Sequence, residues 1–345
     1  MACVRALLWL LVLGLLSACG REAVYRQESF VFGTRVELSI AGQKEDVARA
    51  AAAQVLREFD RLHRTYHAWQ PSELSALNDA LAAGRTTRVS SEMAALLRDA
   101  QRLSRAGDNL FDPGIGRLIA LWGFQSDDLP TALPDAQKLA AWQASRPGIA
   151  DLRIDGQQVR SGKRDVALDF GGYLKGVALD RAAALLKVQG VQNALINIGG
   201  NVMALGTRNG EAWRVGIQHP RRPGALATLE LADGEAIGTS GDYQRYLEID
   251  GQRYCHLLDP RTARPVMHTQ SLTVLIAPGA QAGTLSDVLS KPLFIAGPDW
   301  PRLAGQLAVD QVLRVDASGR LQVSAALQRR LSYVGKQAAD SEIIP

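Results

Sequence analysis

The stretch "LATLELADGEAIGTS", residues 226 to 240, places short apolar-rich runs on both sides of an Asp–Gly pair at 233–234. Runs of this kind around Asp–Gly are typical of neighbouring β-strands. The pattern continues before it in "WRVGIQHP" (213–220) and after it in "RYLEIDGQRYCHLLDP" (245–260), which holds a second Asp–Gly at 250–251. The middle of the chain is therefore predicted to be a succession of strands.

Helical spacing of apolar residues appears on both sides of these strands. Helices are predicted over 45–63, over 90–107 with Ser90 or Ser91 as N-cap and Gly107 as C-cap, from Tyr173 to about Lys187, and within 283–297. Further strands are predicted in "SFVFGTRVELSI" (29–40), "DVALDF" (165–170), "NALINIGGNVMALG" (193–206, with a glycine break) and "QSLTVLIAP" (270–278). Because strands and helices do not alternate regularly, we predict an α+β fold with mixed or antiparallel sheets and packed helices. We expect one compact unit, and a division into two lobes stays open.

The N-terminus has the layout of a secretory signal, with Arg5 before an apolar run that is short for a membrane span. "LSAC" at 16–19 resembles the lipobox of bacterial lipoproteins, which implies cleavage before Cys19 and lipidation of Cys19. An ordinary cleaved signal is the alternative. Gly20 resembles an outer-membrane address more than inner-membrane retention. The expected organisation is a signal peptide over 1–18, a tether over 19–28, the folded domain over 29–335 and a tail over 336–345.

Charge and cysteine content exclude two classes of protein. The formal net charge is +4, and loss of Arg5 with the signal leaves +3. The arginines are dispersed, whereas nucleic-acid binding requires a clustered basic face, so no nucleic-acid partner is expected. If Cys19 carries lipid, Cys255 is left without an intramolecular partner, so the chain is not a disulfide scaffold.

Four segments carry polar residues that a bare core would not need. In "LFDPGIGRLIALWGF" (110–124), Asp112 precedes Pro113 and two nearby glycines; a turn and a helix packed through Trp122 would also explain it. In "DFGGYLKGVALD" (169–180), a predicted strand runs through two glycines into a helix. Free amides at such a helix start can hold anions, and Lys175 would add a charge, although a simple strand–turn–helix has the same pattern.

The other two segments lie later in the chain. Residues 238–265 place His256 and Asp259 three apart beside a proline turn, and a lone histidine is more often structural than catalytic. "GTLSDVLSKPLFIAG" (283–297) holds Asp287 and Lys291 among small and apolar residues, four apart and so on one helix face. A surface ion pair of little energetic value is the alternative there.

Taken in order, these segments resemble the signature of the ApbE family, the bacterial FAD:protein FMN transferases. The resemblance runs from 32 to 297 and rests on "FGT" (32–34), "WQPSELSALN" (69–78), "FDPGIGRLIALWGF" (111–124), "DFGGYLKGVALD" (169–180), "INIGGNVMALG" (196–206), "GTSGDYQRY" (238–246), "HLLDPRTARP" (256–265) and "LFIAG" (293–297).

The resemblance implies that the protein takes FAD, transfers its FMN half to a Thr or Ser hydroxyl of a partner protein, and releases AMP. The implied partners are flavin-carrying subunits of membrane redox complexes that are modified outside the cytoplasm. A lipid-anchored, periplasm-facing location, at the outer membrane rather than the inner one, suits that task. Two alternatives remain: an FAD pyrophosphatase in which water replaces the acceptor hydroxyl, and a non-catalytic flavin carrier whose metal site has decayed.

The resemblance also implies roles for single residues. Phe32 and Trp69 would line the flavin or adenine pocket. FAD would further be contacted by the backbone around Leu110, Phe111 and Asp112, by Asp169 and Lys175, and by the backbone of Leu258. A magnesium ion would bridge the phosphates, held by the Gly172 carbonyl and by side chains near Asp287. His256 would be a base or an orienting group near the acceptor hydroxyl, with chemistry suited to neutral pH.

The sequence departs from the family pattern in three places. "FGT" replaces "MGT", Ala263 stands where glycine is usual, and Lys291 stands where the family has a threonine that helps hold magnesium. Three arrangements of Lys291 are possible. Magnesium still binds through Asp287, Gly172 and Ser290; or the Lys291 ammonium occupies the metal position, paired with Asp287; or Lys291 points away because Pro292 disfavours helical geometry before it. We favour the second, because a lysine would repel a metal there.

Overall fold

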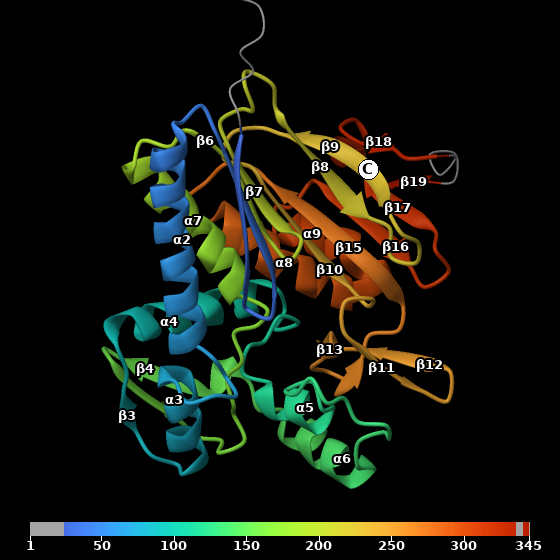
Figure 1. Cartoon of the computed structure of the whole chain (residues 1–345). Helices are drawn as coiled ribbons and strands as arrows, with labels where there is room; N and C mark the ends of the chain where they lie inside the picture. The colour runs from blue at the N-terminus through green and yellow to red at the C-terminus, as the bar shows by residue number, and fades with distance from the viewer. Residues whose placement is uncertain (1–23, 336–340, 345) are drawn as a thin grey trace, which may run out of the picture.

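A nine-stranded sheet forms the centre of the computed structural model, which describes residues 24–335 and 341–344 (Figure 1). The predicted signal peptide and Cys19 lie outside the described residues. All neighbouring strands pair antiparallel except β17 and β19, which are parallel. In sheet order the strands are β1 (Tyr25–Val31), β2 (Thr34–Ala41), β6 (Asn193–Ile198), β7 (Asn201–Leu205), β10 (Ala236–Gly241), β15 (Thr269–Ile276), β16 (Val312–Asp316), β17 (Leu321–Ser324) and β19 (Ser341–Ile344).

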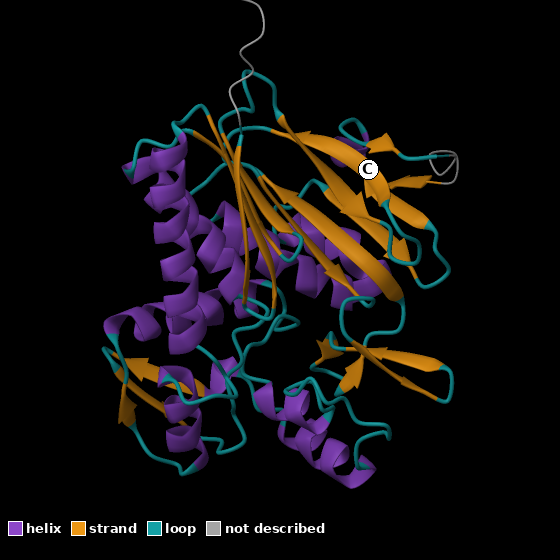
Figure 2. Ribbon diagram, in the orientation of Figure 1, coloured by secondary structure: helices purple, strands orange, loops and turns teal. Residues whose placement is uncertain are grey.

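Helices cover one face of this sheet and a small second sheet covers part of the other (Figure 2). The helices are α2 (Glu45–Thr65), α7 (Leu174–Val188), α8 (Ala282–Ala296) and α9 (Trp300–Gln306). The second sheet has the order β18 (Ser332–Tyr333), β9 (Ala225–Leu231) and β8 (Trp213–Gln218), and α10 (Ala325–Gln328) lies at its side of the molecule. The larger apolar core lies between helices and sheet, and a smaller one lies between the two sheets.

Smaller elements gather below the end of the main sheet (Figure 1). They are α3 (Glu73–Ala82), α4 (Ser91–Ala106), a sheet of β3 (Thr87–Arg88), β5 (Gln158–Ser161) and β4 (Leu152–Asp155), α5 (Gly116–Leu121), α6 (Ala136–Ser145), the hairpin of β11 (Tyr246–Ile249) and β12 (Gln252–Cys255), and the pair β13 (Leu258–Asp259) and β14 (Arg264–Pro265). The predicted α+β class is confirmed. No helix among the described residues is both long and apolar enough to span a bilayer.

The predicted helices are confirmed because their end signals are local. In α4 the Ser90 hydroxyl accepts a hydrogen bond from the Met93 N–H, and Gly107 ends the helix. Ser90 is therefore the N-cap of this helix. Helix α2 has acidic residues in its first turn and basic residues in its last, which suits the helix dipole.

The segment 29–40, predicted as one strand, is a hairpin of β1 and β2 that turns at Phe32 and Gly33. Both residues have positive φ, 56° and 68°. A two-residue turn with positive φ at both positions normally has Asn or Gly at the first of them. Phe32 in that position gave no sequence signal for the turn. Since β1 begins at Tyr25, the predicted tether over 19–28 is also too long by the four residues that pair with β2.

Two other strand predictions differ from the structure. Asp233–Gly234 forms the predicted turn but joins no hairpin, because β9 and β10 belong to different sheets and the turn passes the chain between them. Asp250–Gly251, by contrast, closes the β11–β12 hairpin. Residues 165–170 form a single bridge, Ile115 to Ala167, instead of a strand, because Asn78 and the Pro113 carbonyl take their hydrogen bonds.

The remaining corrections concern the glycine break and the tail. Residues 193–206 are two antiparallel strands that turn at Gly199 and Gly200, which have φ of 57° and 92°. The tail predicted over 336–345 contains β19, which adds a parallel strand to the main sheet beside β17. A short strand paired at the edge of a sheet carries no strong local signal.

Candidate functional site

Two lysines meet one buried carboxylate where α7 and α8 cross. The Lys291 ammonium donates to Asp287 Oδ1 at 2.6 Å and to the Asp287 carbonyl at 2.6 Å. The Lys175 ammonium lies 3.8 Å from the same Oδ1 and donates to the Gly171 carbonyl at 2.8 Å. The side chain of Asp287 is 2% exposed, that of Lys291 14% and that of Lys175 23%. This lysine–aspartate cluster of Lys175, Asp287 and Lys291 is therefore not a surface ion pair.

The two helices that carry the cluster cap each other. Asp287 Oδ2, on α8, accepts from the Gly176 N–H in the first turn of α7 at 3.0 Å. Asp180, on α7, accepts from the Gly283 and Thr284 N–H groups in the first turn of α8 at 2.7 and 2.9 Å. Free N–H groups at helix starts need acceptors, and carboxylates supply them while matching the dipole. No local sequence signal indicates Asp180 or Gly176, because these contacts join segments more than a hundred residues apart.

The helices can approach so closely because both carry glycine at the crossing. A Cβ on Gly176 would lie 2.6 Å from the Gly283 carbonyl oxygen and 2.8 Å from Asp287 Cβ. Helix α8 also lies tightly on β10, where a Cβ on Gly238 would be 2.2 Å from the Ser286 carbonyl oxygen. Ser240 and Ser290 share a hydrogen bond of 2.8 Å between the same two elements. Asp287 is thus held from both sides.

The cluster carries an excess of positive charge. Burial opposes ionisation of Asp287, but the ammonium groups of Lys175 and Lys291 outweigh it and lower its pKa to about 2. Burial lowers the pKa of Lys291 against the attraction of the Asp287 carboxylate. We assign the ammonium form to Lys291, because its Nζ lies within 2.6 Å of two acceptors, one of them ionised. One carboxylate then faces two cations.

The residues present do not fit the magnesium ion that the family resemblance implies. Both carboxylate oxygens of Asp287 are already bonded, one to Lys291 and one to Gly176. The Ser290 hydroxyl donates to the Asp287 carbonyl at 2.9 Å. An ammonium about 4 Å from a divalent cation would repel it by roughly 8 kcal/mol at an effective dielectric of about 20. No group of three or more His, Cys, Asp or Glu that could hold a metal occurs among residues 24–335 and 341–344.

These contacts decide between the three arrangements of Lys291. The arrangement in which Asp287, Gly172 and Ser290 hold magnesium does not fit these residues. Lys291 also does not point away, because α8 continues through Pro292 to Ala296 and keeps Lys291 one turn from Asp287. The Lys291 ammonium is paired with Asp287, as the second arrangement requires.

The turn before α7 joins the cluster to Trp69. Asp169 Oδ1 accepts from the Gly171 N–H at 2.7 Å, and its Oδ2 accepts from the Trp69 indole N–H at 2.9 Å. Asn78 fixes Leu168, the residue before Asp169, by donating to its carbonyl at 2.9 Å and accepting from its N–H at 2.7 Å. Asp169 therefore orders the turn and holds an indole ring that is 38% exposed. Trp69, Asp169 and Lys175 are brought together as predicted.

Two histidines that the sequence analysis missed connect Phe32 to Trp69. The Phe32 ring lies 5.7 Å from the His63 ring, and His63 lies 5.1 Å from His67. His67 Nδ1 accepts from the Trp69 backbone N–H at 3.1 Å. His63 lies at the end of the predicted helix 45–63 and His67 lies beyond it, so no helical spacing indicated that the two rings would meet. Phe32 and Trp69 thus belong to one aromatic series beside the turn.

Residues 110–112 lie next to this turn through their backbone. The Pro113 carbonyl accepts from the Asp169 N–H at 2.8 Å. Leu110 and Phe111 are each only 4% exposed as whole residues, so their side chains belong to the core. Asp112 Oδ1 accepts from the Gly114 and Ile149 N–H groups at 2.7 and 2.8 Å. Burial raises the pKa of Asp112 to about 6, against these two hydrogen bonds.

We expect Asp112→Asn to stabilise the ligand-free protein at pH 7.5 by about 3 kcal/mol, because a shift of about two pKa units costs roughly that much. The folded pKa of about 6 exceeds the ordinary value of 3.8, so stability present below pH 3.8 is lost as the pH rises through 6. Asparagine keeps the Oδ1 acceptor but never ionises. Thermal melts of both proteins at pH 7.5 and pH 4 test this, since the gain should disappear at pH 4. A variant that melts no higher than wild type at pH 7.5 would contradict it.

His256 faces the cluster but is a weaker base than predicted. Its Nδ1 lies 3.1 Å from the Arg245 carbonyl, which makes Nδ1 the protonated nitrogen and leaves the Nε2 lone pair available. Burial lowers the pKa of His256 to about 4, and the charges of Lys175 and Lys291 lower it too. The imidazole is therefore neutral at pH 7. The prediction that its chemistry suits neutral pH is not met in the ligand-free protein.

Leu258 and Ala263 lie after His256, in and beside the β13–β14 pair. Leu258 is buried with Ile115, Leu118 and Trp122, so its side chain belongs to the core. Ala263 is buried with φ of 59°, and its carbonyl accepts from the Trp122 indole N–H at 2.9 Å. A left-handed conformation favours glycine and costs alanine about 1 kcal/mol. That backbone geometry accounts for the usual glycine at the Ala263 position.

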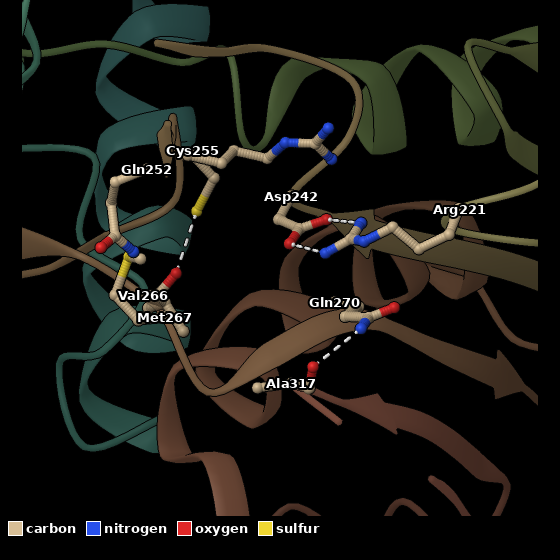
Figure 3. A pocket seen from close by; sticks show the side chains of 9 residues that line it. Arg221, Asp242, Gln252, Cys255, Val266, Met267, Gln270 and Ala317 are labelled. Atoms are coloured by element: carbon tan, nitrogen blue, oxygen red, sulfur yellow. Dashed lines mark hydrogen bonds and ion pairs between the residues drawn. The ribbon is translucent and has the colours of Figure 1, made fainter. Parts of the chain in front are cut away.

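A small cavity of about 180 Å³ is lined in part by Cys255, the residue before His256 in the sequence (Figure 3). Its polar groups are satisfied: Arg221 forms a bidentate pair with Asp242 at 2.6 Å, and Gln270 donates to the Ala317 carbonyl at 2.9 Å. The Cys255 thiol donates to the Val266 carbonyl at 3.3 Å, and burial raises its pKa to about 12. The thiol of Cys255 is therefore not a reactive group in this cavity.

Comparison with known proteins identifies relatives over most of the chain. The ApbE family model matches residues 32–313. An FAD:protein FMN transferase of Rhodobacter capsulatus is 40% identical over 306 residues, which are 88% of this chain and 58% of that protein. One of Klebsiella pneumoniae (strain 342) is 32% identical over 274 residues, 77% of each chain. The crystal structure of the ApbE protein from Thermotoga maritima superposes with a TM-score of 0.81 at 29% identity, covering 89% of this chain and 99% of that one.

Proposed function

The chain belongs to the ApbE family, and from this premise we propose that it transfers FMN from FAD to a Thr or Ser hydroxyl of a partner redox protein and releases AMP. The partner is a flavin-carrying subunit of a membrane redox complex. The observation that carries the proposal is the lysine–aspartate cluster, which holds two ammonium groups against one buried carboxylate. Such a site is electrostatically incomplete without an anion, and the diphosphate of FAD supplies one.

Each side chain has a definite task in this reaction. The acceptor oxygen attacks the phosphorus on the riboflavin side, the bond from that phosphorus to the bridging oxygen breaks, and AMP leaves with the bridging oxygen. Lys175 and Lys291 neutralise charge on the diphosphate, which is the main requirement of phosphoryl transfer. His256 Nε2 is the acceptor for the hydroxyl proton. Burial is the main cause of the low His256 pKa, and the charges of Lys175 and Lys291 lower it further; a bound diphosphate offsets that second contribution.

The aromatic series and the turn position the rest of FAD. Trp69 presents a partly exposed ring that Asp169 holds in place. An exposed indole fixed by a hydrogen bond is a suitable surface for a flavin or adenine ring, because little conformational freedom is lost on binding. The family resemblance implies magnesium at the phosphates as well, but the residues around Asp287 do not fit it, so none of these steps uses a metal.

A transfer assay tests the function. The protein, FAD and a flavin-acceptor subunit are incubated; the gel is then read for acceptor fluorescence and the solution is analysed for AMP. A fluorescent acceptor band with equal AMP supports the proposal. AMP and free FMN without the band would instead indicate a pyrophosphatase, and FAD binding without AMP would indicate a carrier. Lys175→Ala should reduce AMP release strongly, whereas Lys187→Ala, on the exposed end of the same helix, should not.

We propose that the protein is anchored by lipid on Cys19 and faces the periplasm, with the outer membrane favoured. The support is the "LSAC" sequence at 16–19 and Gly20 after it. Cys19→Ser should leave an uncleaved precursor or release the protein from membranes. Membrane fractionation with size analysis tests this, and a variant that fractionates like wild type at the mature size would refute the anchor.

A further inference from the structure

We propose that the Lys291 ammonium takes the place of a divalent cation, so that this chain binds and cleaves the diphosphate of FAD without metal. Lys175 and Lys291 are then the two cations that contact the phosphates. The inference rests on the proposed function and states which groups neutralise the negative charge of the diphosphate.

The Lys291 side chain occupies the space between Asp287 and Gly172. The Lys291 side chain lies so close to Gly172 that a Cβ there would be 2.7 Å from Lys291 Cε and 3.1 Å from Cδ. Its Nζ is anchored at 2.6 Å on Asp287 Oδ1. The lysine therefore fills the position between Asp287 and the Gly172 backbone, which is where the family resemblance places a metal. A cation that must share Asp287 has no free carboxylate oxygen to bind, since Oδ2 already accepts from Gly176.

The two ammonium groups carry more positive charge and more N–H donors than the cluster itself uses. An ammonium has three N–H donors. Lys291 uses two of them on Asp287, and Lys175 uses one on the Gly171 carbonyl. Donors remain on both lysines, and the cluster keeps one positive charge beyond what Asp287 neutralises. Phosphate oxygens are acceptors of the matching sign. The bonds made and broken are those of the proposed transfer, so the step needs no additional reactant.

Asp287, which holds the Lys291 ammonium, is itself fixed in position by contacts with α7 and β10. Asp287 is fixed by α7 through Gly176, and Ser290 ties the same turn of α8 to Ser240 on β10. The aspartate therefore presents the ammonium from a rigid crossing of two helices. A lysine carries one charge where a divalent ion carries two, so the expected enzyme is slower than a metal-dependent one but indifferent to chelator.

The test measures FAD binding by flavin fluorescence in EDTA and in MgCl₂, and bound Mn²⁺ by electron paramagnetic resonance of the FAD-loaded protein. For wild type we expect the same Kd in both buffers, no bound Mn²⁺, and AMP release in EDTA. Lys291→Thr should bind FAD at least about tenfold more weakly in EDTA, because it loses a charge-assisted hydrogen bond. In MgCl₂ the FAD affinity of this variant should recover. In the separate Mn²⁺ measurement, the FAD-loaded variant should bind one Mn²⁺ per chain.

Two further variants keep the result interpretable. Lys291→Met removes the charge without adding an oxygen ligand, so its affinity should stay low in both buffers. Lys291→Arg keeps the charge and should retain chelator-independent binding. Melts of the ligand-free variants show whether each is folded.

Wild-type binding or AMP release that collapses in EDTA and returns with magnesium overturns the inference while leaving the proposed function intact. Bound Mn²⁺ in wild type has the same meaning. Absence of FAD binding by wild type in either buffer overturns both. Chelator-independent FAD binding without AMP release or transfer overturns the proposed function and the metal-free cleavage, and retains only metal-free binding by Lys291.

Discussion

Replacing Asp287 by alanine is expected to lower the free energy of unfolding by about 3–5 kcal/mol, because it leaves buried cations without a counter-ion. Lys291 and Lys175 would lose their shared carboxylate, and the Gly176 N–H would lose its acceptor. For a chain of this size the melting temperature should fall by roughly 6–10 °C. Thermal or urea unfolding of the ligand-free protein measures the effect.

Matched variants show whether the charge imbalance is the cause. Asp310→Ala removes an exposed carboxylate and should change the melting temperature by little. The double variant Asp287→Ala with Lys291→Met should be more stable than Asp287→Ala alone, because an apolar replacement of a buried ion pair is often tolerated. If Asp287→Ala melts like wild type, the cluster is not an electrostatic unit and the argument for an anion site fails with it.

The sequence predicted those parts of the fold whose signals are local. Helix α4 is bounded by a serine that caps its first turn and by Gly107 at its end, and both lie within a few residues of the helix. The β11–β12 hairpin turns on an Asp–Gly pair. Such signals depend on the backbone preferences of single residues, which a sequence shows directly.

What the sequence did not show depends on tertiary contacts. Phe32 adopts a left-handed turn conformation that phenylalanine does not favour, so the hairpin was missed. The β9–β10 turn has a hairpin signal, yet the two strands belong to different sheets and do not pair with each other. In both places the surrounding structure outweighs the local preference, as tertiary context often does for strands.

In the candidate site, too, some features could be predicted from the sequence and others depend on tertiary contacts. The family resemblance grouped Trp69, Asp169 and Lys175 as residues that contact FAD, and the structure places all three at the turn before α7. The protonation of His256 could not be predicted, because its pKa depends on burial and on lysines from two distant helices. The capping contacts of Asp287 and Asp180 could not be predicted for the same reason, since each carboxylate reaches across a helix crossing.

That crossing gives the second large expected effect. Gly176→Ala should destabilise the protein by about 1–3 kcal/mol, the usual cost of overpacking, although alanine is the better helix former by about 1 kcal/mol. The added Cβ would lie 2.6 Å from the Gly283 carbonyl oxygen and 2.7 Å from Thr284 Cα. Both are backbone atoms of α8, so relief requires the helices to separate. Separation moves Asp287 away from Lys175, and FAD affinity should fall together with stability.

The same substitution in an open position should have the opposite sign. Gly305 lies in α9, and a Cβ there would meet nothing within 4 Å. Gly305→Ala should therefore raise the free energy of unfolding by about 0.5–1 kcal/mol, through helix propensity alone. Urea unfolding of the two variants, with FAD binding measured on each, separates packing from propensity. If Gly176→Ala proves as stable as Gly305→Ala and binds FAD like wild type, α7 and α8 do not need close contact to hold the lysines at Asp287.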